Sequence, residues 1–313
     1  MLLPVLLLLS FKCGPSAQPK TTAFNLVTEK QFNDLFPQRD KFYTYTAFIK
    51  AVKDMSLIKL KITQRDVYFF QFIRTDKSTG KSTQVRQDMY FNEDWAKEKP
   101  EVVYNIDFGN FCTESSPSVN KKELAAFFAQ IAHETRLGQN GTYTDGLMLI
   151  HEGNGTLPYI ADNKTYPAVA GKKYYGRGPM QLSYNSNYGK ISDCLFGDKN
   201  VLLNNPGLIE TDPVVAFKTA ICFWMMPEIN KPAAHDVMTG KWQPTADDKA
   251  KGRTTAGFGL TIDIINGALE CNKGENNPGM ADRIGFYQYF LTKLGASDPN
   301  CACSCAKMQP YVQ

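Results

Sequence analysis

The clearest periodic pattern in the chain predicts a helix near its middle. Its apolar residues recur at three- and four-residue intervals, which place side chains on one face of an α-helix. They are Leu124, Phe127, Phe128 and Ile131. Asn120 is a suitable N-cap with Glu123 three residues later, as in a capping box, and Gly138 is a suitable stop. Glu134 comes three residues after the last apolar position and therefore extends the apolar face.

Other helices are predicted from caps and apolar runs. Thr28 with Gln31 forms a capping-box pattern that opens a short helix through Leu35, which Pro37 stops. Four further helices are expected over Thr46 to Met55, Val214 to Met226 after the Asp212–Pro213 cap, Gly259 to Leu269, and Ala281 to Leu294.

Two segments have the composition of strands. Val67 to Ile73 and Thr83 to Phe91 are rich in β-branched and aromatic residues, and turn-forming residues at 76–80 separate them. The stretch at about 140–178 is rich in Gly, Asn and Tyr and predicts long loops. The fold is therefore expected to be mainly α, with long loops and one small β-hairpin insertion.

Composition and charge narrow the class of protein. The chain has 313 residues, 43% of them hydrophobic, which is enough to bury a sizeable core. The net charge is +4 without a long basic run, so nucleic acid is not an expected partner. Residues 1–17, MLLPVLLLLSFKCGPSA, carry an apolar run too short to span a membrane, which predicts a secretory signal peptide. No later segment is apolar enough to span a bilayer, so we expect a secreted, extracellular monomer.

The cysteines of a secreted chain predict disulfides. Without Cys13, which lies in the predicted signal peptide, seven remain, and an odd number leaves one free or paired elsewhere. The CACSC cluster at 301–305 lacks a second half with the spacing of a zinc site, so disulfides are favoured over a metal site. We expect one cysteine of the cluster to pair with Cys271.

Two glutamates in different settings indicate acid–base chemistry. Glu134 follows His133 on the predicted helix, and Glu152 follows His151 in a Gly-rich, polar stretch. An apolar setting favours a protonated carboxyl, and a solvated polar setting favours an ionised one. Glycoside hydrolases use such a pair, one carboxyl as the acid and the other as the base or nucleophile. Glu134 would then be the acid and Glu152 the base. From these residues alone, the alternative is that each is a solvated carboxylate, at a helix end and in a loop respectively.

A zinc site is not expected. A metalloprotease helix needs a second His four residues after the first, whereas Leu137 and Gly155 occupy those positions. The only other His is His235, so neither a metal nor another cofactor is predicted.

The stretch 174–189, YYGRGPMQLSYNSNYG, resembles the signature of the family 19 glycoside hydrolases, chitinases of plants and bacteria. Other segments resemble this family in the same order. They are FNDLFPQRDKFYTYTAFIKA (32–51), AAFFAQIAHET (125–135), AFKTAICFWMMP (216–227), KPAAHDV (231–237), IINGALEC (264–271) and DRIGFYQYF (282–290). The resemblance covers most of residues 32–295 and implies a lysozyme-like α+β glycosidase fold with long cleft-forming loops.

The resemblance also implies roles for single residues. Glu134 matches the family's general acid, Glu152 its general base in a form similar to bacterial members, and Ser183 the hydroxyl that holds the attacking water. Amides donate and accept hydrogen bonds and tyrosines offer flat faces, although a single Asn is also a common cap and a Tyr a common core residue. The residues that match or suit the sugar cleft are Gln181, Asn187, Tyr175, Lys231, Asn266 and Arg283. For Arg283 the resemblance also implies an influence on the carboxylates.

The implied reaction is endo-acting, inverting hydrolysis of β-1,4-linked N-acetylglucosamine in chitin or chitooligosaccharides. Inversion needs two carboxyls about 6.5–9.5 Å apart, which leaves room for a water. An alternative substrate is peptidoglycan, which also contains N-acetylglucosamine. A non-catalytic chitin-binding protein is disfavoured because Glu134, Glu152 and Ser183 are all present.

We expect a signal peptide (1–17) and a single catalytic domain (18–313). The family-like core covers about 32–55 and 112–295, residues of about 56–111 form an insertion, and 296–313 form a Cys-rich tail. Ser186 stands where many plant members have Tyr, so one sugar subsite is expected to differ. Glycosylation sequons begin at Asn140, Asn154 and Asn163.

Overall fold

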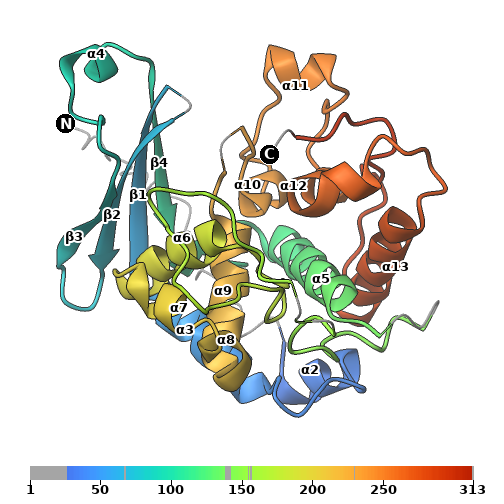
Figure 1. Ribbon diagram of the computed structural model, residues 1–313. Coiled ribbons are helices and arrows are strands. Elements are labelled where there is room, and N and C mark those ends of the chain that lie inside the picture. Colours follow the sequence, from blue (N-terminus) through green and yellow to red (C-terminus); the bar gives the residue numbers. More distant parts are fainter. Residues whose placement is uncertain are drawn as a thin grey trace, which may run out of the picture.

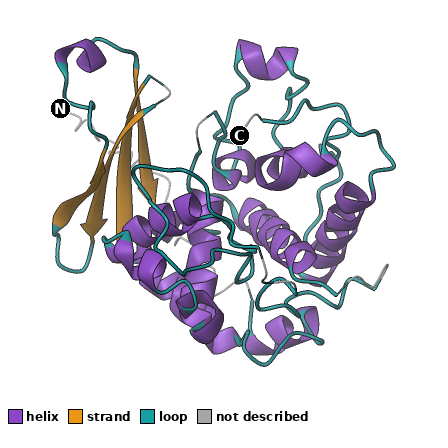
Figure 2. Cartoon of the chain, in the orientation of Figure 1, coloured by secondary structure: helices purple, strands orange, loops and turns teal. Residues whose placement is uncertain are grey.

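The structure, a computed structural model, describes residues 27–311 apart from residues 67, 138–141, 154, 156 and 229. The predicted signal peptide, Cys13, the helix stop at Gly138 and the sequons at Asn140 and Asn154 lie outside the described residues. Helices form one body, and a small sheet stands beside it (Figures 1 and 2). In the part of the chain that is described, no helix is long and apolar enough to cross a membrane.

In the described residues, six helices of more than ten residues build the body. They are α3 (Tyr45–Ser56), α5 (Pro117–Glu134), α6 (Asn185–Phe196), α9 (Pro213–Met225), α12 (Phe258–Glu270) and α13 (Pro278–Lys293). Shorter helices are α2 (Glu29–Leu35), α4 (Asp94–Lys97), α7 (Asn200–Asn204), α8 (Leu208–Thr211), α10 (Ala234–Met238) and α11 (Ala246–Ala250), with a 3-10 turn at Phe108–Asn110. The predictions for α2, α3, α9, α12 and α13 are confirmed within a few residues.

Helix α5 lies at the centre of the body and packs against α13 (Figure 1). Every side chain from Glu123 to Ala132 is buried, so the helix is enclosed on all sides. The predicted N-cap is wrong: the helix begins at Pro117, and Ser116 caps it by accepting a hydrogen bond from Val119 N. Ser followed by Pro is the stronger start signal, because Pro fits the first helical turn without losing a bonded N–H.

The predicted hairpin is part of a four-stranded antiparallel sheet of order β3-β2-β1-β4. The strands are β1 (Ile58–Arg65), β2 (Phe69–Asp76), β3 (Ser82–Gln87) and β4 (Glu101–Asp107). The sequence prediction found β2 and β3 but missed the other two. β1 follows α3 almost without a loop, and the edge strand β4 has mostly exposed side chains and therefore no alternation of buried and exposed positions.

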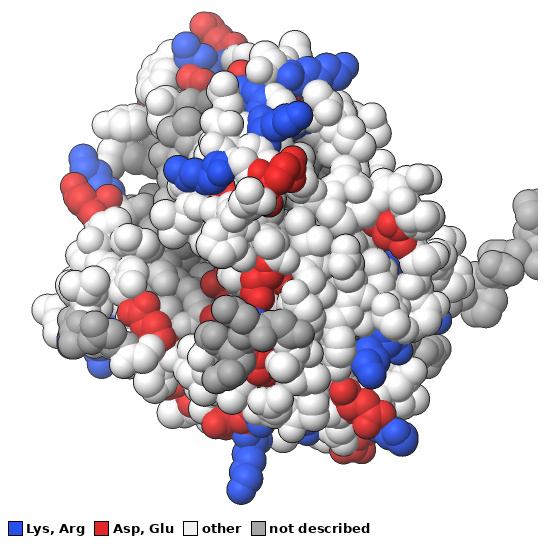
Figure 3. Space-filling view, turned by 90° about the vertical axis from the view of Figure 1, so that its right-hand side faces the viewer, with Lys and Arg blue, Asp and Glu red and all other residues white. Residues whose placement is uncertain are grey.

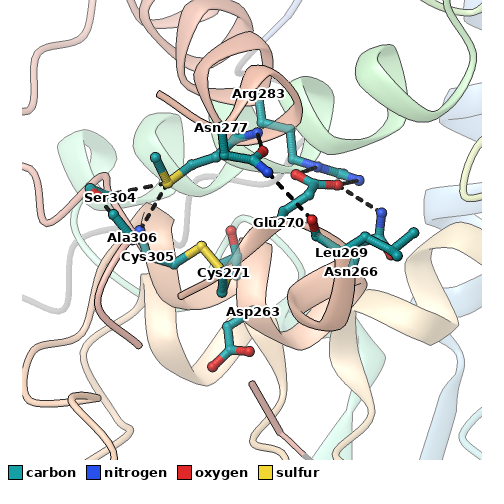
Figure 4. Close-up of a disulfide and its surroundings, with 12 residues drawn as sticks. Asp263, Asn266, Leu269, Glu270, Cys271, Asn277, Arg283, Ser304, Cys305 and Ala306 are labelled. Carbon is teal, nitrogen blue, oxygen red and sulfur yellow. Dashed lines mark hydrogen bonds and ion pairs between the residues drawn. A yellow bond between two sulfur atoms is a disulfide. The ribbon is translucent and has the colours of Figure 1, made fainter. Parts of the chain in front are cut away.

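The C-terminal tail is fixed to α12 by a disulfide between Cys271 and Cys305, which confirms the predicted pairing (Figure 4). A second disulfide joins Cys301 and Cys303. The remaining described cysteines, Cys112, Cys194 and Cys222, are free and buried. The expectation that only one thiol is left over is therefore wrong, because these three serve as small apolar side chains between helices.

A buried ion-pair network joins α5 to α10. The Glu123 carboxylate is 0% exposed, accepts a hydrogen bond from the Trp224 indole at 3.0 Å, and contacts Nδ1 of His235 at 2.7 Å. The other ring nitrogen of His235 contacts Glu114 at 2.8 Å. Burial alone would lower the pKa of His235, but the Glu123 carboxylate raises it, to about 10. The imidazole therefore carries its proton, and its charge, at neutral pH.

We expect His235→Gln to lower the free energy of unfolding by about 3–5 kcal/mol at pH 6, because it leaves a buried carboxylate without its cation. The folded-state pKa lies above the ordinary value of 6.5. The stabilisation is therefore complete below that value and is lost as the pH rises toward 10. Urea unfolding at pH 6 and pH 9 should show the variant's deficit shrinking at the higher pH. The exposed His151 provides the control: His151→Gln should change stability little, and an equal loss there would contradict the assignment.

Candidate active site

Glu134 is the last residue of α5, and its carboxylate meets a buried arginine of α13. Nη2 of Arg283 donates to Oε1 of Glu134 at 2.5 Å. The side chain of Glu134 is 19% exposed, while that of Arg283 is only 1% exposed. An ion pair therefore joins α5 to α13, and only its glutamate reaches solvent.

Arg283 holds a second carboxylate at the same time. Its Nε and Nη2 each donate to an oxygen of Glu270 at 2.8 Å, and its Nη1 donates to Gln130 at 2.6 Å. Nδ2 of Asn266 donates to the same Glu270 carboxylate at 2.7 Å. Figure 4 shows Arg283, Glu270 and Asn266 converging. The planar guanidinium thus fixes Glu134 from α5 against Glu270 from α12.

Glu270 was not among the predicted site residues. Burial alone would raise the pKa of Glu270, but the Arg283 guanidinium lowers it below its ordinary value. A signal for this residue exists in the sequence: Glu270 comes four residues after Asn266 and one position beyond the end of the predicted helix, so a helix longer by one residue places both on one face. Both lie in IINGALEC, a segment that resembles the family.

The surroundings of Glu134 differ from the expected apolar wall. The carboxylate faces a cation that two carboxylates share, so fixed charges surround it. Arg283 is 0% exposed and bonds to Glu134 and Glu270, so it does not line the cleft, whereas its second expected role, an influence on the carboxylates, fits these contacts. It orients Glu134 while the glutamate itself reaches solvent.

A second group of charged residues lies at the C-terminal end of α5. Asp282 contacts Nδ1 of His133 at 2.6 Å and also pairs with Arg136. Arg136 pairs in turn with the buried Asp145 at 2.9 Å. Because Asp145 lies in the loop after α5, these pairs hold that loop beside Glu134.

Backbone hydrogen bonds connect the residue after Glu134 to the segment that carries Glu152, and connect Glu152 itself to the signature segment. The carbonyl of Thr135, next to Glu134, accepts from Leu149 N at 2.9 Å. Farther along, Glu152 N donates to the carbonyl of Gly176 in the signature segment at 2.9 Å. The acid candidate, the base candidate and the signature therefore belong to one connected region.

Glu152 is half-buried in a polar loop, as expected. Its Oε2 accepts a hydrogen bond from the Tyr159 hydroxyl at 2.9 Å. This bond favours the protonated phenol and raises the pKa of Tyr159. The ring of Tyr159 packs edge-on against Tyr184, which is 45% exposed, with 5.2 Å between the ring centroids. Tyr159 was not predicted, and it holds the Glu152 carboxylate in place.

Three predicted residues of the signature are linked through their backbone carbonyls. The Ser183 hydroxyl donates to the carbonyl of Gln181 at 2.9 Å, and Nδ2 of Asn187 donates to the carbonyl of Ser183 at 2.9 Å. Gln181 adopts a left-handed backbone, with φ of 47°, which turns the chain sharply before Ser183. All three side chains are half-buried and form one polar edge.

The side chains of Tyr175 and Lys231, both expected at the sugar cleft, are in contact with other residues of the protein. The Arg177 guanidinium lies 3.5 Å from the centroid of the Tyr175 ring and covers one of its faces. Nζ of Lys231 donates to the carbonyl of Ile264 at 3.2 Å, and burial lowers the pKa of Lys231. One face of Tyr175 is therefore unavailable to a sugar ring.

The face in Figure 3 is the right-hand side of Figure 1 and has a hollow near its middle. Asp and Glu side chains gather around this hollow, and Lys and Arg lie mostly farther out. Among the described residues, no group of three or more His, Cys, Asp or Glu side chains is arranged to hold a metal ion. The chemistry that these residues offer is that of paired carboxylates with amides and hydroxyls beside them.

Comparisons with known proteins point to one family. The family model described as "Chitinase class I" matches residues 100–303. An endochitinase from Carica papaya is 45% identical over 208 residues, which cover 65% of this chain and 83% of that protein. An endochitinase from Brassica napus is 46% identical over 194 residues, covering 61% of this chain and 59% of that protein. The chain spans about three fifths of the length of several such plant relatives.

Solved structures give the same result. Chitinase C from Streptomyces griseus is 31% identical with a TM-score of 0.59, covering 92% of this chain and 84% of that one. A class IV family 19 chitinase from Zea mays is 27% identical with a TM-score of 0.57, covering 91% of this chain and all of that one. The lysozyme-like fold predicted from the sequence is thereby confirmed. By the extent of the matched sequence, this chain belongs to the class I chitinase family, glycoside hydrolase family 19.

Proposed function

We propose that this chain is an endochitinase that hydrolyses β-1,4-linked N-acetylglucosamine in chitin or chitooligosaccharides. The observation that carries the proposal is the arrangement of Glu134: a partly exposed carboxyl held by a buried arginine that Glu270 shares. Glycoside hydrolysis needs a positioned carboxyl at the leaving oxygen and a second one at the water. The matched relatives from papaya and rapeseed are named endochitinases, which supports the choice of polymer.

In the proposed mechanism Glu134 donates a proton to the glycosidic oxygen as the bond breaks. Glu152 takes a proton from a water on the opposite face of the sugar, and the oxygen of that water bonds to the anomeric carbon, which inverts this centre. Tyr159 holds the base through its 2.9 Å hydrogen bond, and the Ser183 hydroxyl helps to place the water. Arg283 and Glu270 touch neither the sugar nor the water; they fix the direction of the acid.

Two finer assignments belong to the same proposal. We infer that the sheet is an addition to the family core, since the family match begins at residue 100, after three of the four strands. We also propose that the chain is a bacterial-type member, which the sequence of the loop around Glu152 supports, although the endochitinases compared above come from plants. We also propose secretion, because the apolar run in 1–17 suits a signal peptide and two disulfides form most readily in an oxidising compartment.

The first experiment is to incubate the purified protein with chitohexaose and record the products and their anomeric form by NMR within seconds to minutes. The expected products are shorter chitooligosaccharides whose new reducing ends are initially α. The parallel measurement is the loss of turbidity of bacterial cell walls, which should be small.

Two results would change the proposal. Initial β-anomers would contradict the inverting pair, because retention requires a covalent intermediate on a carboxylate close to the acid. Loss of wall turbidity without cleavage of chitohexaose would mean that the same residues act on peptidoglycan instead of chitin.

A further inference from the structure

A cavity of about 180 Å³ lies between the sheet and α6, which stand next to each other in Figure 1. Sheet residues that line it include Gln64, Phe72, Arg86 and Tyr104. Ser186 and Asn187 line it from the first turn of α6. The cavity therefore exists only because the sheet is added to the helical body.

The strand register builds the sheet's side of this cavity as one continuous row. Tyr104 of β4 lies opposite Ile62 of β1, Ile62 opposite Phe72 of β2, and Phe72 opposite Arg86 of β3. Residues directly opposite in a sheet present their side chains on the same face. Gln64 is two positions along β1 from Ile62 and adds an amide to that face. The row thus combines aromatic rings with hydrogen-bonding groups.

The row is rigid. Nε and Nη2 of Arg86 donate to the Asp88 carboxylate at 2.9 and 2.8 Å, and its guanidinium lies 4.9 Å from the centroid of the Phe72 ring. Gln64 is 7% exposed, and its Nε2 donates to the carbonyl of Asp66 at 2.9 Å, which leaves the amide oxygen as an acceptor. These groups are preorganised, so a ligand need not order them on binding.

The chemistry of the walls suits a sugar unit. A pyranose ring presents C–H groups on its faces and hydroxyls at its edge, and an N-acetyl group adds one donor and one acceptor. Tyr104 offers a flat apolar surface, while Gln64 and Asn187 offer amides. The volume is below the range of about 300–1,000 Å³ for drug-sized ligands, so the cavity suits a single unit and not an oligomer.

One residue of α6 links the cavity to the candidate site. Asn187 lines the cavity and also donates to the carbonyl of Ser183 at 2.9 Å. Ser186, beside it, has a small side chain, and a changed sugar subsite is expected at this position from the sequence. A polymer bound along the signature segment would therefore lie next to a residue that also lines the cavity.

We propose that the sheet adds a sugar-binding subsite to this protein, in which the cavity takes one N-acetylglucosamine unit of a bound chitooligosaccharide. The proposal rests on the proposed function for the identity of the polymer. It assigns to the sheet a role in substrate length, because a unit in the cavity is separated from the cleaved bond.

The test compares kcat/KM for chitohexaose and chitotetraose in Tyr104→Ala, Tyr104→Phe and wild type. We expect Tyr104→Ala to lower the hexaose-to-tetraose ratio by roughly five- to tenfold, the effect of losing one aromatic contact. Tyr104→Phe keeps the ring and should keep most of the ratio. The protein should come from a host without N-glycosylation, since Asn163 begins a sequon and lines the same cavity.

Val103, the preceding residue of β4, is 41% exposed and points away from the cavity, so Val103→Ala is the matched control. An unchanged ratio in Tyr104→Ala, or an equal change in Val103→Ala, would overturn the subsite. If wild type cleaves neither oligomer, the proposed function is wrong, but the subsite is still open to test.

In that case, or if Tyr104→Ala does not fold, chitotriose is titrated into isotope-labelled Glu134→Gln protein. Shifts of the Gln64 side-chain amide support the subsite, and their absence rejects it.

Discussion

Replacing Glu134 with Gln is expected to lower kcat on chitohexaose by roughly 10²- to 10⁴-fold, the range that general acid catalysis contributes. Gln has the same shape but holds no proton to donate to the leaving oxygen. The fold should persist, because Arg283 keeps both of its 2.8 Å contacts with Glu270. Binding of chitohexaose should therefore remain measurable by calorimetry while turnover disappears.

The matched comparison is Glu152→Ala in the presence of azide. A small anion can replace a missing base and attack the sugar directly, so azide should restore turnover and yield a glycosyl azide in that variant. Azide cannot replace a missing proton donor, so Glu134→Gln should stay inactive. Retained hydrolysis in Glu134→Gln, or azide rescue of that variant, would remove Glu134 from the role of acid.

The helix that presents Glu134 could be predicted from the sequence because its apolar residues repeat with the period of an α-helix. Periodicity places Glu134 near the enclosed face but does not say what it meets there. Arg283, which meets it, is 149 residues away in the sequence. Only the packing of α5 against α13 brings the two together, so an apolar wall was predicted where a cation lies.

Competing helix-start signals in the sequence explain why the N-cap of α5 was predicted wrongly. Asn120 and Glu123 look like a capping box, yet both side chains are 0% exposed and bind neighbouring segments. The Ser116–Pro117 start lies one turn earlier and prevails. The sheet was underpredicted for a related reason: β4 is held by backbone pairing to β1, and such pairing leaves no apolar pattern in an edge strand.

Arg283→Met is expected to lower the free energy of unfolding by about 3–5 kcal/mol at pH 7, the usual result of removing one partner from a buried ion pair. Met fills much of the same volume but leaves the carboxylates of Glu134 and Glu270 together without a cation. Activity should fall too, because the acid loses the group that orients it. Adding Glu270→Gln should recover part of the stability, because one of the two uncompensated charges is removed.

The pH dependence gives the sharper test of the same network. In wild type the pKa of Glu270 lies below its ordinary value of 4.5, so its contribution to stability is present above that value and is lost as the pH falls. Without Arg283, burial is the dominant influence and should raise the pKa of Glu270 instead. Its charged form then destabilises the fold at neutral pH, and protonation relieves this. Urea unfolding should therefore show Arg283→Met gaining stability relative to wild type between pH 7 and pH 5. A deficit that is constant over this range would mean that Arg283 acts by packing alone.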